Sequence, residues 1–336
     1  MLILAIETSC DDTSASVLLD GRNILSNVVS SQISIHQKYG GVVPELASRK
    51  HIESIVPVVK EALKIAQVTL KDIGGIAVTQ GPGLIGSFLV GVSFAKSLAF
   101  SAQIPLIGVN HIEAHLSAIF LEHEAPRFPY LGMVVSGGHT AIFRVNGFGS
   151  YILLGQTRDD AAGEAFDKVA KFLGLGYPGG PVIEEWSKKG NPNAIRFPKP
   201  YLGKDSLDFS FSGIKTAVVN YIKTNYGVKE NFPESLIKDV ASSFQEVVVE
   251  ILVQKILKAA KAQGLKRIVL SGGVAANQYL RQKIKQEAKE EKLKIYIPSP
   301  GLCTDNAAMV GVVGYEYLKR GLKSSTTLNA YSNINI

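Results

Sequence analysis

Two histidines four residues apart are the side chains best suited to chemistry, in the run Asn110-His-Ile-Glu-Ala-His115. At this spacing both lie on one face of a helix, one turn apart, where they can share a metal ion. Asn110 is a good N-cap, so we expect the helix to begin there. The positive end of the helix dipole then disfavours the imidazolium form, and the neutral ring is the form that binds a metal.

The place of the histidine pair in the chain favours metal binding over a pair of polar residues on a solvated face. The pair follows a strand-like run at 105–109, and ligand sites in open α/β sheets gather at the carboxyl ends of strands. A zinc peptidase would need His-Glu-x-x-His, with the glutamate next to the first histidine. Glu113 is instead two residues after His111, about 200° around the helix, so it is misplaced as the base of a peptidase.

Asp305 is a candidate for a third, oxygen ligand to the same metal. It lies in Cys303-Thr-Asp-Asn306, after a strand-like run and before the last predicted helix. Its alternative role is only that of an N-cap for this helix, and the sequence leaves both roles open. We expect Cys303 to be a buried free thiol rather than a ligand.

Three turns combine glycine or hydroxyl residues in a way that suits a phosphate. Val134-Val-Ser-Gly-Gly-His-Thr140 offers close backbone approach at its glycines and hydroxyls at both ends. Leu270-Ser-Gly-Gly-Val-Ala-Ala-Asn277 runs from a strand into a helix, and Asn277 is a candidate to read a purine or a ribose. Glu7-Thr-Ser-Cys-Asp-Asp-Thr-Ser14 supplies hydroxyls and carboxylates. Any one could be an ordinary tight turn, but three at matching places favour a ligand. There is no Walker A or Gly-x-Gly-x-x-Gly pattern, which disfavours P-loop and Rossmann folds.

The run from Arg158 to Lys168 carries carboxylates at i, i+3 and i, i+4 spacing, which is typical of a helix with internal ion pairs. Its alternative role is a polar wall that contacts sugar hydroxyls. Gly176-Tyr-Pro-Gly-Gly-Pro181 is a loop able to wrap a ligand.

The segment from Arg196 to Phe232 mixes basic and aromatic residues, which suits a single-stranded or looped RNA. A solvated insertion with a small apolar cluster explains the same pattern equally well. The residues concerned are Arg196, Lys199, Lys204, Lys215 and Lys223, with Phe197, Tyr201, Phe209, Phe211, Tyr221 and Tyr226.

The elements that position these residues follow one order twice. Each half opens with three strand-like runs and continues with helices alternating with strands, which predicts a mixed, largely parallel sheet. In the first half the expected strands are 2–6, 14–19, 23–29, 75–79 and 105–109, with helices at 44–66 and 86–100. In the second half the expected strands are 131–135, 140–145, 151–155, 267–270 and 294–298, with helices at 161–173, 234–263, 274–290 and 305–320. Asp20-Gly21 predicts a hairpin turn.

This pattern resembles the duplicated α/β fold of actin, the sugar kinases and the heat-shock ATPases, with two lobes and a central cleft. We expect an N-terminal lobe at 1–109, a metal-binding helix and connection at 110–130, and a C-terminal lobe at 131–322. An insertion at about 177–232 interrupts the second lobe, and a loose polar tail follows at 323–336.

Composition narrows the class of protein further. A chain of 336 residues with 46% apolar residues can bury two cores. Its only cysteines, Cys10 and Cys303, indicate a reducing compartment without a disulfide framework. The N-terminus lacks the pattern of a signal peptide, and the apolar window 84–100 is broken by serines and a lysine, so we expect a cytoplasmic protein without a membrane span. The net charge of +7 fits a nucleotide or nucleic-acid partner but is shared by many enzymes.

The motifs taken together resemble the bacterial TsaD family, the tRNA adenosine threonylcarbamoyltransferases once described as O-sialoglycoprotein endopeptidases. The resemblance runs in order along essentially the whole chain. The motifs that carry it are Glu-Thr-Ser-Cys-Asp-Asp-Thr13, Asn-His-Ile-Glu-Ala-His115, Val-Ser-Gly-Gly-His-Thr140, Asp-Asp-Ala-Ala-Gly-Glu-Ala-Phe-Asp-Lys168, Tyr-Pro-Gly-Gly-Pro181, Phe-Ser-Gly-Ile-Lys-Thr216, Ser-Gly-Gly-Val-Ala-Ala-Asn277 and Thr-Asp-Asn-Ala-Ala308.

The resemblance implies an activity and a set of site residues. The family moves a threonylcarbamoyl group from threonylcarbamoyl-adenylate to N6 of the adenosine 3′ to the anticodon, in tRNAs that read ANN codons. It implies one iron or zinc ion at His111, His115 and Asp305. It places the adenylate, or ATP, along Val134, Val135, Ser136, Gly137, Gly138, Asp167, Gly180, Glu184 and Asn277. Asp11 is our candidate for a catalytic base.

The resemblance also implies partners, namely tRNA, the proteins TsaB and TsaE, and TsaC as the source of the adenylate. Three other functions remain as alternatives. A metallopeptidase would cleave glycoproteins, a small-molecule kinase would transfer phosphate without tRNA, and an ATP-dependent scaffold would only bind nucleotide and partners.

Overall fold

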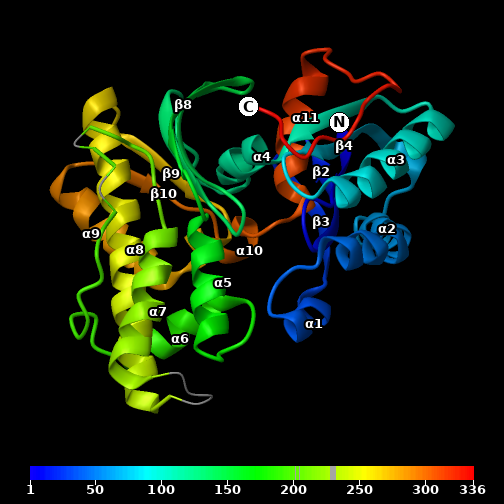
Figure 1. The fold of residues 1–336 in the computed structure, drawn as a ribbon. Helices are drawn as coiled ribbons and strands as arrows, with labels where there is room; N and C mark the ends of the chain where they lie inside the picture. The colour runs from blue at the N-terminus through cyan, green and yellow to red at the C-terminus, as the bar shows by residue number, and fades with distance from the viewer. Residues whose placement is uncertain (201, 204, 228–231) are drawn as a thin grey trace. The chain divides into compact units, whose positions relative to one another are not determined.

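The computed structural model describes residues 1–200, 202–203, 205–227 and 232–336. They form two compact units. Unit 1 consists of Met1–Pro126, Gly147–Ser150 and Pro298–Ile336, and unit 2 consists of Arg127–Asn146 and Tyr151–Ile297. Figure 1 shows the elements of both units, coloured along the chain.

Unit 1 is built on a five-stranded mixed sheet with the order β3-β2-β1-β4-β5. Its strands are β1 (Leu2–Glu7), β2 (Asp12–Leu19), β3 (Asn23–Ser31), β4 (Ile73–Gly81) and β5 (Leu106–Asn110). β1 pairs antiparallel with β2 and parallel with β4, as the alternation of strands and helices predicts. The predicted hairpin turn between β2 and β3 is confirmed, because Asp20 and Gly21 both have positive φ.

Helices cover both faces of this sheet. One face packs against α2 (Pro44–Ile65) and α3 (Ile85–Ala102), where Phe88, Val92 and Ala95 are buried with strand residues. The other face packs against α4 (His111–Ser117) and α11 (Ala307–Lys319). The short helices α1 (Ile33–His36) and α10 (Pro300–Cys303) complete the unit.

Unit 2 repeats the sheet of unit 1, with the order β10-β9-β6-β7-β8. Its strands are β6 (Tyr130–Val135), β7 (Thr140–Gly147), β8 (Ser150–Gln156), β9 (Arg267–Ser271) and β10 (Lys294–Tyr296). β6 pairs antiparallel with β7 and parallel with β9, as β1 does with β2 and β4. The duplication predicted from the sequence pattern is therefore present in the strand pairing.

The helices of unit 2 are α5 (Ala162–Phe172), α6 (Gly179–Ser187), α7 (Ser212–Tyr226), α8 (Glu234–Gln263) and α9 (Gln278–Glu290). The long helix α8, yellow in Figure 1, is buried along most of its length and packs with α6, α7 and α9. α9 begins at Gln278 rather than at the expected residue 274, because Asn277 caps it and Gly273–Ala276 form a separate 3-10 turn.

The predicted insertion at 177–232 contributes α6, α7 and apolar side chains to the core of unit 2. Phe197, Phe209 and Phe211 are buried, so three of the six aromatic rings considered for RNA stacking lie inside the unit. Lys199 pairs with Glu250, and Lys215 lies 3.5 Å from Asp160. Tyr201 and Lys204 lie outside the described residues. The apolar-cluster interpretation of this segment thus accounts for much of its pattern.

The expectation of a loose tail from residue 323 is wrong. Ala330 is buried and Leu328 packs against the core of unit 1. The amide of Tyr331 donates to the carbonyl of Gln80 over 2.8 Å, and the carbonyl of Ser332 accepts from Gly83. Apolar contacts and backbone hydrogen bonds therefore hold this tail against unit 1. Its polar composition alone did not predict this.

The unit boundaries differ from the expected lobes at the end of the chain. Residues 298–322 were expected in the second lobe, but Pro298–Ile336 belong to unit 1. The physical reason is the apolar face of α11, where Met309, Val310 and Val313 are buried against strand residues such as Ile3 and Ala77.

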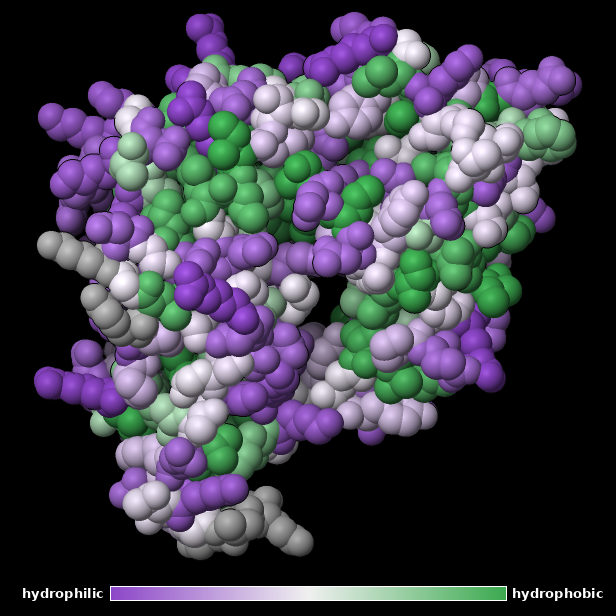
Figure 2. Space-filling model, turned by 45° about the horizontal axis from the view of Figure 1, so that its top comes forward, coloured by the Kyte–Doolittle hydropathy of each residue, from purple (hydrophilic) through white to green (hydrophobic). Residues whose placement is uncertain are grey.

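One described helix, α3, is long and apolar enough to cross a membrane by length and composition. Its residues Phe88, Val92 and Ala95 are nevertheless part of the core of unit 1. Hydrophilic and hydrophobic residues are interspersed over the face of the molecule drawn in Figure 2.

Candidate functional site

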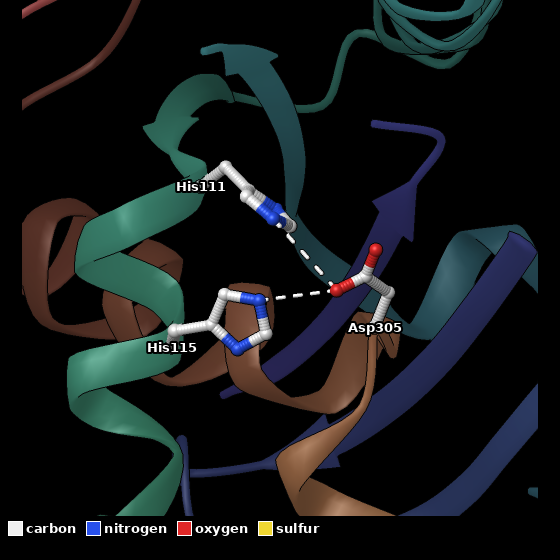
Figure 3. Close-up of side chains that lie close together, drawn as sticks. All are labelled: His111, His115 and Asp305. Carbon is white, nitrogen blue, oxygen red and sulfur yellow. Dashed lines mark ion pairs between the residues drawn. The ribbon is translucent and has the colours of Figure 1, made fainter. Parts of the chain in front are cut away.

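The two histidines of α4 project from the same face of a short helix, as predicted (Figure 3). The predicted N-cap is confirmed, because the side-chain oxygen of Asn110 accepts hydrogen bonds from the amides of Ile112 and Glu113. The two rings lie edge to face, with centroids 4.6 Å apart. Both histidines are buried, so their nitrogens are shielded from bulk water.

Asp305 lies opposite the two rings. One oxygen, Oδ1, is 3.0 Å from Nε2 of His115 and 3.7 Å from Nε2 of His111. The alternative role of Asp305 as an N-cap does not hold, because Asn306 caps α11 by accepting from the amide of Met309. The side chain of Asp305 therefore faces the histidines, although this residue precedes the helix by only two positions.

Glu7 is a member of this cluster that the sequence analysis did not single out. It ends β1, is fully buried, and its Oε2 lies 3.2 Å from Nδ1 of His111 and 2.6 Å from the hydroxyl of Thr79. Its position at the carboxyl end of β1, which runs parallel to β4 in the same sheet as β5, was the available signal. A proton on Nδ1 of neutral His111, donated to Glu7, leaves the Nε2 lone pair facing Asp305.

The electrostatics of the cluster follow from burial and from charge pairing. Burial alone would raise the pKa of Glu7, but the neighbouring His111 lowers it below its ordinary value. Burial alone would lower the pKa of His111, yet Glu7 and Asp305 raise it to about 9 in the protein without a bound ion. The expectation of a neutral ring from the helix dipole is therefore wrong for His111 in that state, because the two carboxylates outweigh the dipole. Burial, together with the charge on His111, lowers the pKa of His115.

The cluster fits a metal ion in donor chemistry and in spacing. Two imidazole nitrogens and a carboxylate oxygen are ligands that zinc and iron accept. The candidate ligand atoms of His111, His115 and Asp305 all lie within 4.8 Å of one another. Ligands about 2.1 Å from a tetrahedral ion lie about 3.4 Å apart, which is between the two nitrogen–oxygen distances observed. The structure thus brings together the three residues predicted as ligands.

Asp11, the candidate base, lies with Cys10 in the turn between β1 and β2, and Asp12 is the first residue of β2. Burial raises the pKa of Asp11, and it raises the pKa of the Cys10 thiol well above the usual range. His51 of α2 fixes this turn, because its Nε2 donates to the carbonyl of Cys10 and its Nδ1 accepts from the hydroxyl of Thr13. Burial and nearby negative charges raise the pKa of Asp12 to about 7.

In unit 2, the glycine-rich turn between β6 and β7 is closed by its own hydrogen bonds. The amide of Ser136 donates to the carbonyl of His139, and the amide of His139 donates to the hydroxyl of Ser136. Gly137 and Gly138 have open space where a Cβ would stand. This turn follows Val134 and Val135, which are buried in β6.

Asn277 belongs to a chain of buried amide and hydroxyl groups. Its Oδ1 accepts from the amide of Leu280 and its Nδ2 donates to Gln245, whose own amide donates to the hydroxyl of Ser187. Asn277 therefore has a structural role as the cap of α9 in addition to any role at a ligand.

Gly180 lies at the start of α6, whereas Asp167 of α5 and Glu184 of α6 each contact the start of another helix. Asp167 accepts from the amide of Gly179 at the start of α6, and Glu184 accepts from the amide of Gln278 at the start of α9. Gly180 has open space at its Cβ position. The predicted ion pairs of the neighbouring segment are confirmed, because Lys168 contacts both Asp160 and Glu164.

Glu113 points away from the histidines, as its spacing predicts. Its Oε1 accepts hydrogen bonds from the hydroxyl of Tyr317 and from the amide of Gly149. A metallopeptidase would need this carboxylate beside a metal-bound water, so the geometry does not favour that alternative.

Comparisons with known proteins show the family and the fold of this chain. A family model described as tRNA N6-adenosine threonylcarbamoyltransferase matches residues 23–312. The protein of that name from Syntrophotalea carbinolica is 56% identical over 333 residues, covering 99% of this chain and 96% of the relative. The protein of the same name from Thermodesulfovibrio yellowstonii is 57% identical and covers 98% of both chains.

Solved structures at low sequence identity share the fold. Full-length HypF, in a phosphate- and nucleotide-bound form, aligns with a TM-score of 0.64 at 16% identity, over 96% of this chain and 56% of that chain. The activator of the 2-hydroxyisocaproyl-CoA dehydratase from Clostridium difficile aligns with a TM-score of 0.52 at 13% identity, over 96% of this chain and 97% of that chain.

The duplicated sheets and these neighbours define a protein of the actin-like ATPase fold. Within that class, the chain belongs to the TsaD family of tRNA N6-adenosine threonylcarbamoyltransferases.

Proposed function

We propose that this chain transfers the threonylcarbamoyl group of threonylcarbamoyl-adenylate to N6 of the adenosine 3′ to the anticodon, in tRNAs that read ANN codons, and releases AMP. Family membership across nearly the whole chain supports the transferase activity. The single observation of the structure that carries the proposal is the convergence of His111, His115 and Asp305 from distant parts of the sequence.

His111, His115 and Asp305 are the proposed ligands of one Fe²⁺ or Zn²⁺ per chain. Such an ion, when bound, supplies a Lewis acid for the carbamoyl carbonyl or a clamp for the adenylate phosphate. Glu7 orients the His111 ring through Nδ1. Bound metal, measured by mass spectrometry of the purified protein, should fall well below one ion per chain in His111→Ala. Full occupancy in that variant would exclude this ligand set.

The proposed adenylate site comprises Val134, Val135, Ser136, Gly137, Gly138, Asp167, Gly180, Glu184 and Asn277. The open space at Gly137, Gly138 and Gly180 supports it, because the main chain there can approach a phosphate. Asp167, Glu184 and Asn277 hold the helix starts of α6 and α9 through hydrogen bonds to amides.

In the proposed reaction, the N6 amine of adenosine attacks the carbamoyl carbon, the bond from that carbon to the phosphate oxygen breaks, and AMP leaves with the bonding pair. The amine must lose one proton, and Asp11 is the proposed acceptor because burial raises its pKa above the ordinary value of a carboxyl group. Unchanged turnover of Asp11→Asn at saturating adenylate would rule this assignment out.

The proposed macromolecular substrate is tRNA, and the proposed partners are TsaB and TsaE, with TsaC as the source of the adenylate. The test is mass spectrometry of tRNA nucleosides after incubation with this chain, TsaB, TsaE and threonylcarbamoyl-adenylate. Threonylcarbamoyl-adenosine that forms only when this chain is present is the expected result. Its absence, with metal and nucleotide shown to be bound, would favour an ATP-dependent scaffold or a kinase.

A further inference from the structure

Glu113 is a buried carboxylate between two proposed metal ligands, yet it faces away from them. It lies two residues after His111 and two before His115 on α4, and only 3% of its surface is exposed. Burying a carboxylate is costly unless hydrogen bonds compensate it. Its partners therefore indicate why a carboxylate stands at this position.

Two hydrogen bonds converge on one oxygen of Glu113. Its Oε1 accepts from the hydroxyl of Tyr317 over 2.7 Å and from the amide of Gly149 over 3.2 Å. Burial and the negative charge of Glu113 raise the pKa of Tyr317 above its ordinary range, so the phenol remains a donor.

Tyr317 connects this carboxylate to the segment that carries the third proposed ligand. It lies near the carboxyl end of α11, a helix of 13 residues whose N-cap, Asn306, directly follows Asp305. A helix of this length is a rigid rod of about 20 Å. Through Tyr317, Glu113 thus links α4, which carries the two histidines, to the carboxyl-terminal end of α11. The amino-terminal end of α11 begins two residues after Asp305.

The position of α4 depends on tertiary contacts of this kind because the helix has only seven residues. A helix this short is not stable by itself and takes its position from its contacts. Those contacts include the Asn110 cap, the packing of Ala114 in the cluster that includes Ala307 and Val310, and the hydrogen bonds of Glu113.

The turn around Gly149, which belongs to unit 1, supplies the second donor to Glu113 and is itself held by contacts within that unit. The ring of Phe148 lies 5.1 Å from that of Phe120, and its carbonyl accepts from Arg320 over 3.1 Å. Gly149 has φ +78°, and a Cβ there would lie 3.2 Å from the hydroxyl of Tyr317. Glycine is thereby favoured where the main chain donates to Glu113.

We infer that Glu113 is a positioning residue for the metal ligands, holding α4 against α11 so that His111 and His115 face Asp305. This inference rests on the proposed metal site. A residue of this kind acts through the geometry of the ligands, and losing it typically weakens metal binding by 10- to 100-fold.

The experiment measures zinc affinity of the full chain by competition with a chromogenic chelator. We expect about a tenfold loss in Glu113→Ala and a smaller, about threefold, loss in Tyr317→Phe. Glu113→Gln should stay within about twofold of the original protein, because its carbonyl oxygen accepts from both donors. Tyr315→Phe is the matched control, since it removes a hydroxyl from the same helix, and its affinity should not change.

Cobalt substitution supplies a second readout, because the visible bands of Co²⁺ report ligand geometry rather than global stability. The bands should shift in Glu113→Ala and match the original protein in Glu113→Gln. Original affinity and bands in Glu113→Ala would overturn the inference. If that variant does not fold, Tyr317→Phe decides, and an unchanged affinity there overturns it. Unchanged affinity in His115→Ala is a different result, which would reject the metal site itself.

Discussion

The candidate metal site of unit 1 and the candidate adenylate site of unit 2 use different chemical groups. In unit 1, the side chains of Glu7, His111, His115 and Asp305 meet in a cluster of titratable groups in which all but Asp305 are buried. In unit 2, the turns after β6 and β9 present main-chain groups at glycines together with uncharged side chains. These side chains include the hydroxyl of Ser136 and the amide of Asn277. The first site depends on charge and on long-range convergence, whereas the second depends on local backbone shape.

This difference sets the kind of change to which each site is sensitive. Removing one member of the cluster in unit 1 leaves buried polar partners without compensation. Adding a methyl group at a turn in unit 2 obstructs the main chain while leaving every charge in place. Substitutions that respect this distinction should separate the two sites experimentally.

The largest expected effect is that of His115→Ala on transfer to tRNA. Loss of a proposed ligand should remove several kcal/mol of transition-state stabilisation, so the rate should fall by at least about a hundredfold, together with bound metal. His123→Gln is the control, because it replaces a histidine of unit 1 that is exposed and lies outside the cluster. An active His115→Ala protein that retains its metal would contradict the description of this site.

A methyl group at Gly272 should have the next largest effect. Gly272 has φ +92°, and a Cβ there would lie 2.4 Å from the carbonyl oxygen of Val135. Gly272→Ala should lower the free energy of unfolding by about 3 kcal/mol, measured by chemical denaturation. Gly273→Ala has open space and should be close to neutral. Equal effects of the two substitutions would show that backbone shape does not distinguish this turn.

The pH dependence of stability should expose Asp12, beside the charged cluster of unit 1. Its folded pKa is raised to about 7 by burial and by the charges of Asp11 and Asp305, and one of its oxygens has no hydrogen-bond partner among the described residues. The folded state therefore holds a proton that the unfolded state releases, and stability falls as pH rises from about 4 through 7.

Asp12→Asn should remove this penalty. At pH 8 the variant should be more stable than the original protein by about 2 kcal/mol, and the difference should shrink as pH falls toward 4. The measurement is urea denaturation at a series of pH values, with Asp20→Asn as an exposed control. A difference that does not vary with pH would show that Asp12 does not titrate in this way.

The smallest effect is expected on the surface of unit 2. Lys168 contacts Asp160 and Glu164 but is partly exposed, so solvent screens both pairs. Lys168→Met should change the free energy of unfolding by less than about 1 kcal/mol. The measurement is thermal denaturation. A larger loss of stability would show that charge pairing matters in unit 2 as well as in unit 1.

The sequence predicted what local patterns determine. The succession of strands and helices along the chain, the Asn110 cap and the place of α8 follow from hydrophobic periodicity and capping residues. The shared face of His111 and His115 follows from their spacing. The sequence offered two roles for Asp305, metal ligand and N-cap, and could not decide between them. The structure decides, because Asn306 rather than Asp305 caps α11.

What the sequence did not reveal depends on contacts between distant segments. The approach of Glu7 to His111 joins residues more than a hundred positions apart, and no local pattern encodes it. The end of the chain is ordered by Leu328 and Ala330 in a core far away in sequence. Burial of Phe209 and Phe211 likewise became visible only when the insertion was seen packed in its unit.

The state of the two cysteines has a practical consequence for labelling. Cys303 is fully buried, and burial keeps the Cys10 thiol protonated well above neutral pH. Because the thiolate is the species that attacks a maleimide, both native cysteines should react slowly in the folded protein. A cysteine introduced at an exposed position such as Lys289 of α9 should then accept a fluorophore selectively, without prior removal of the native thiols.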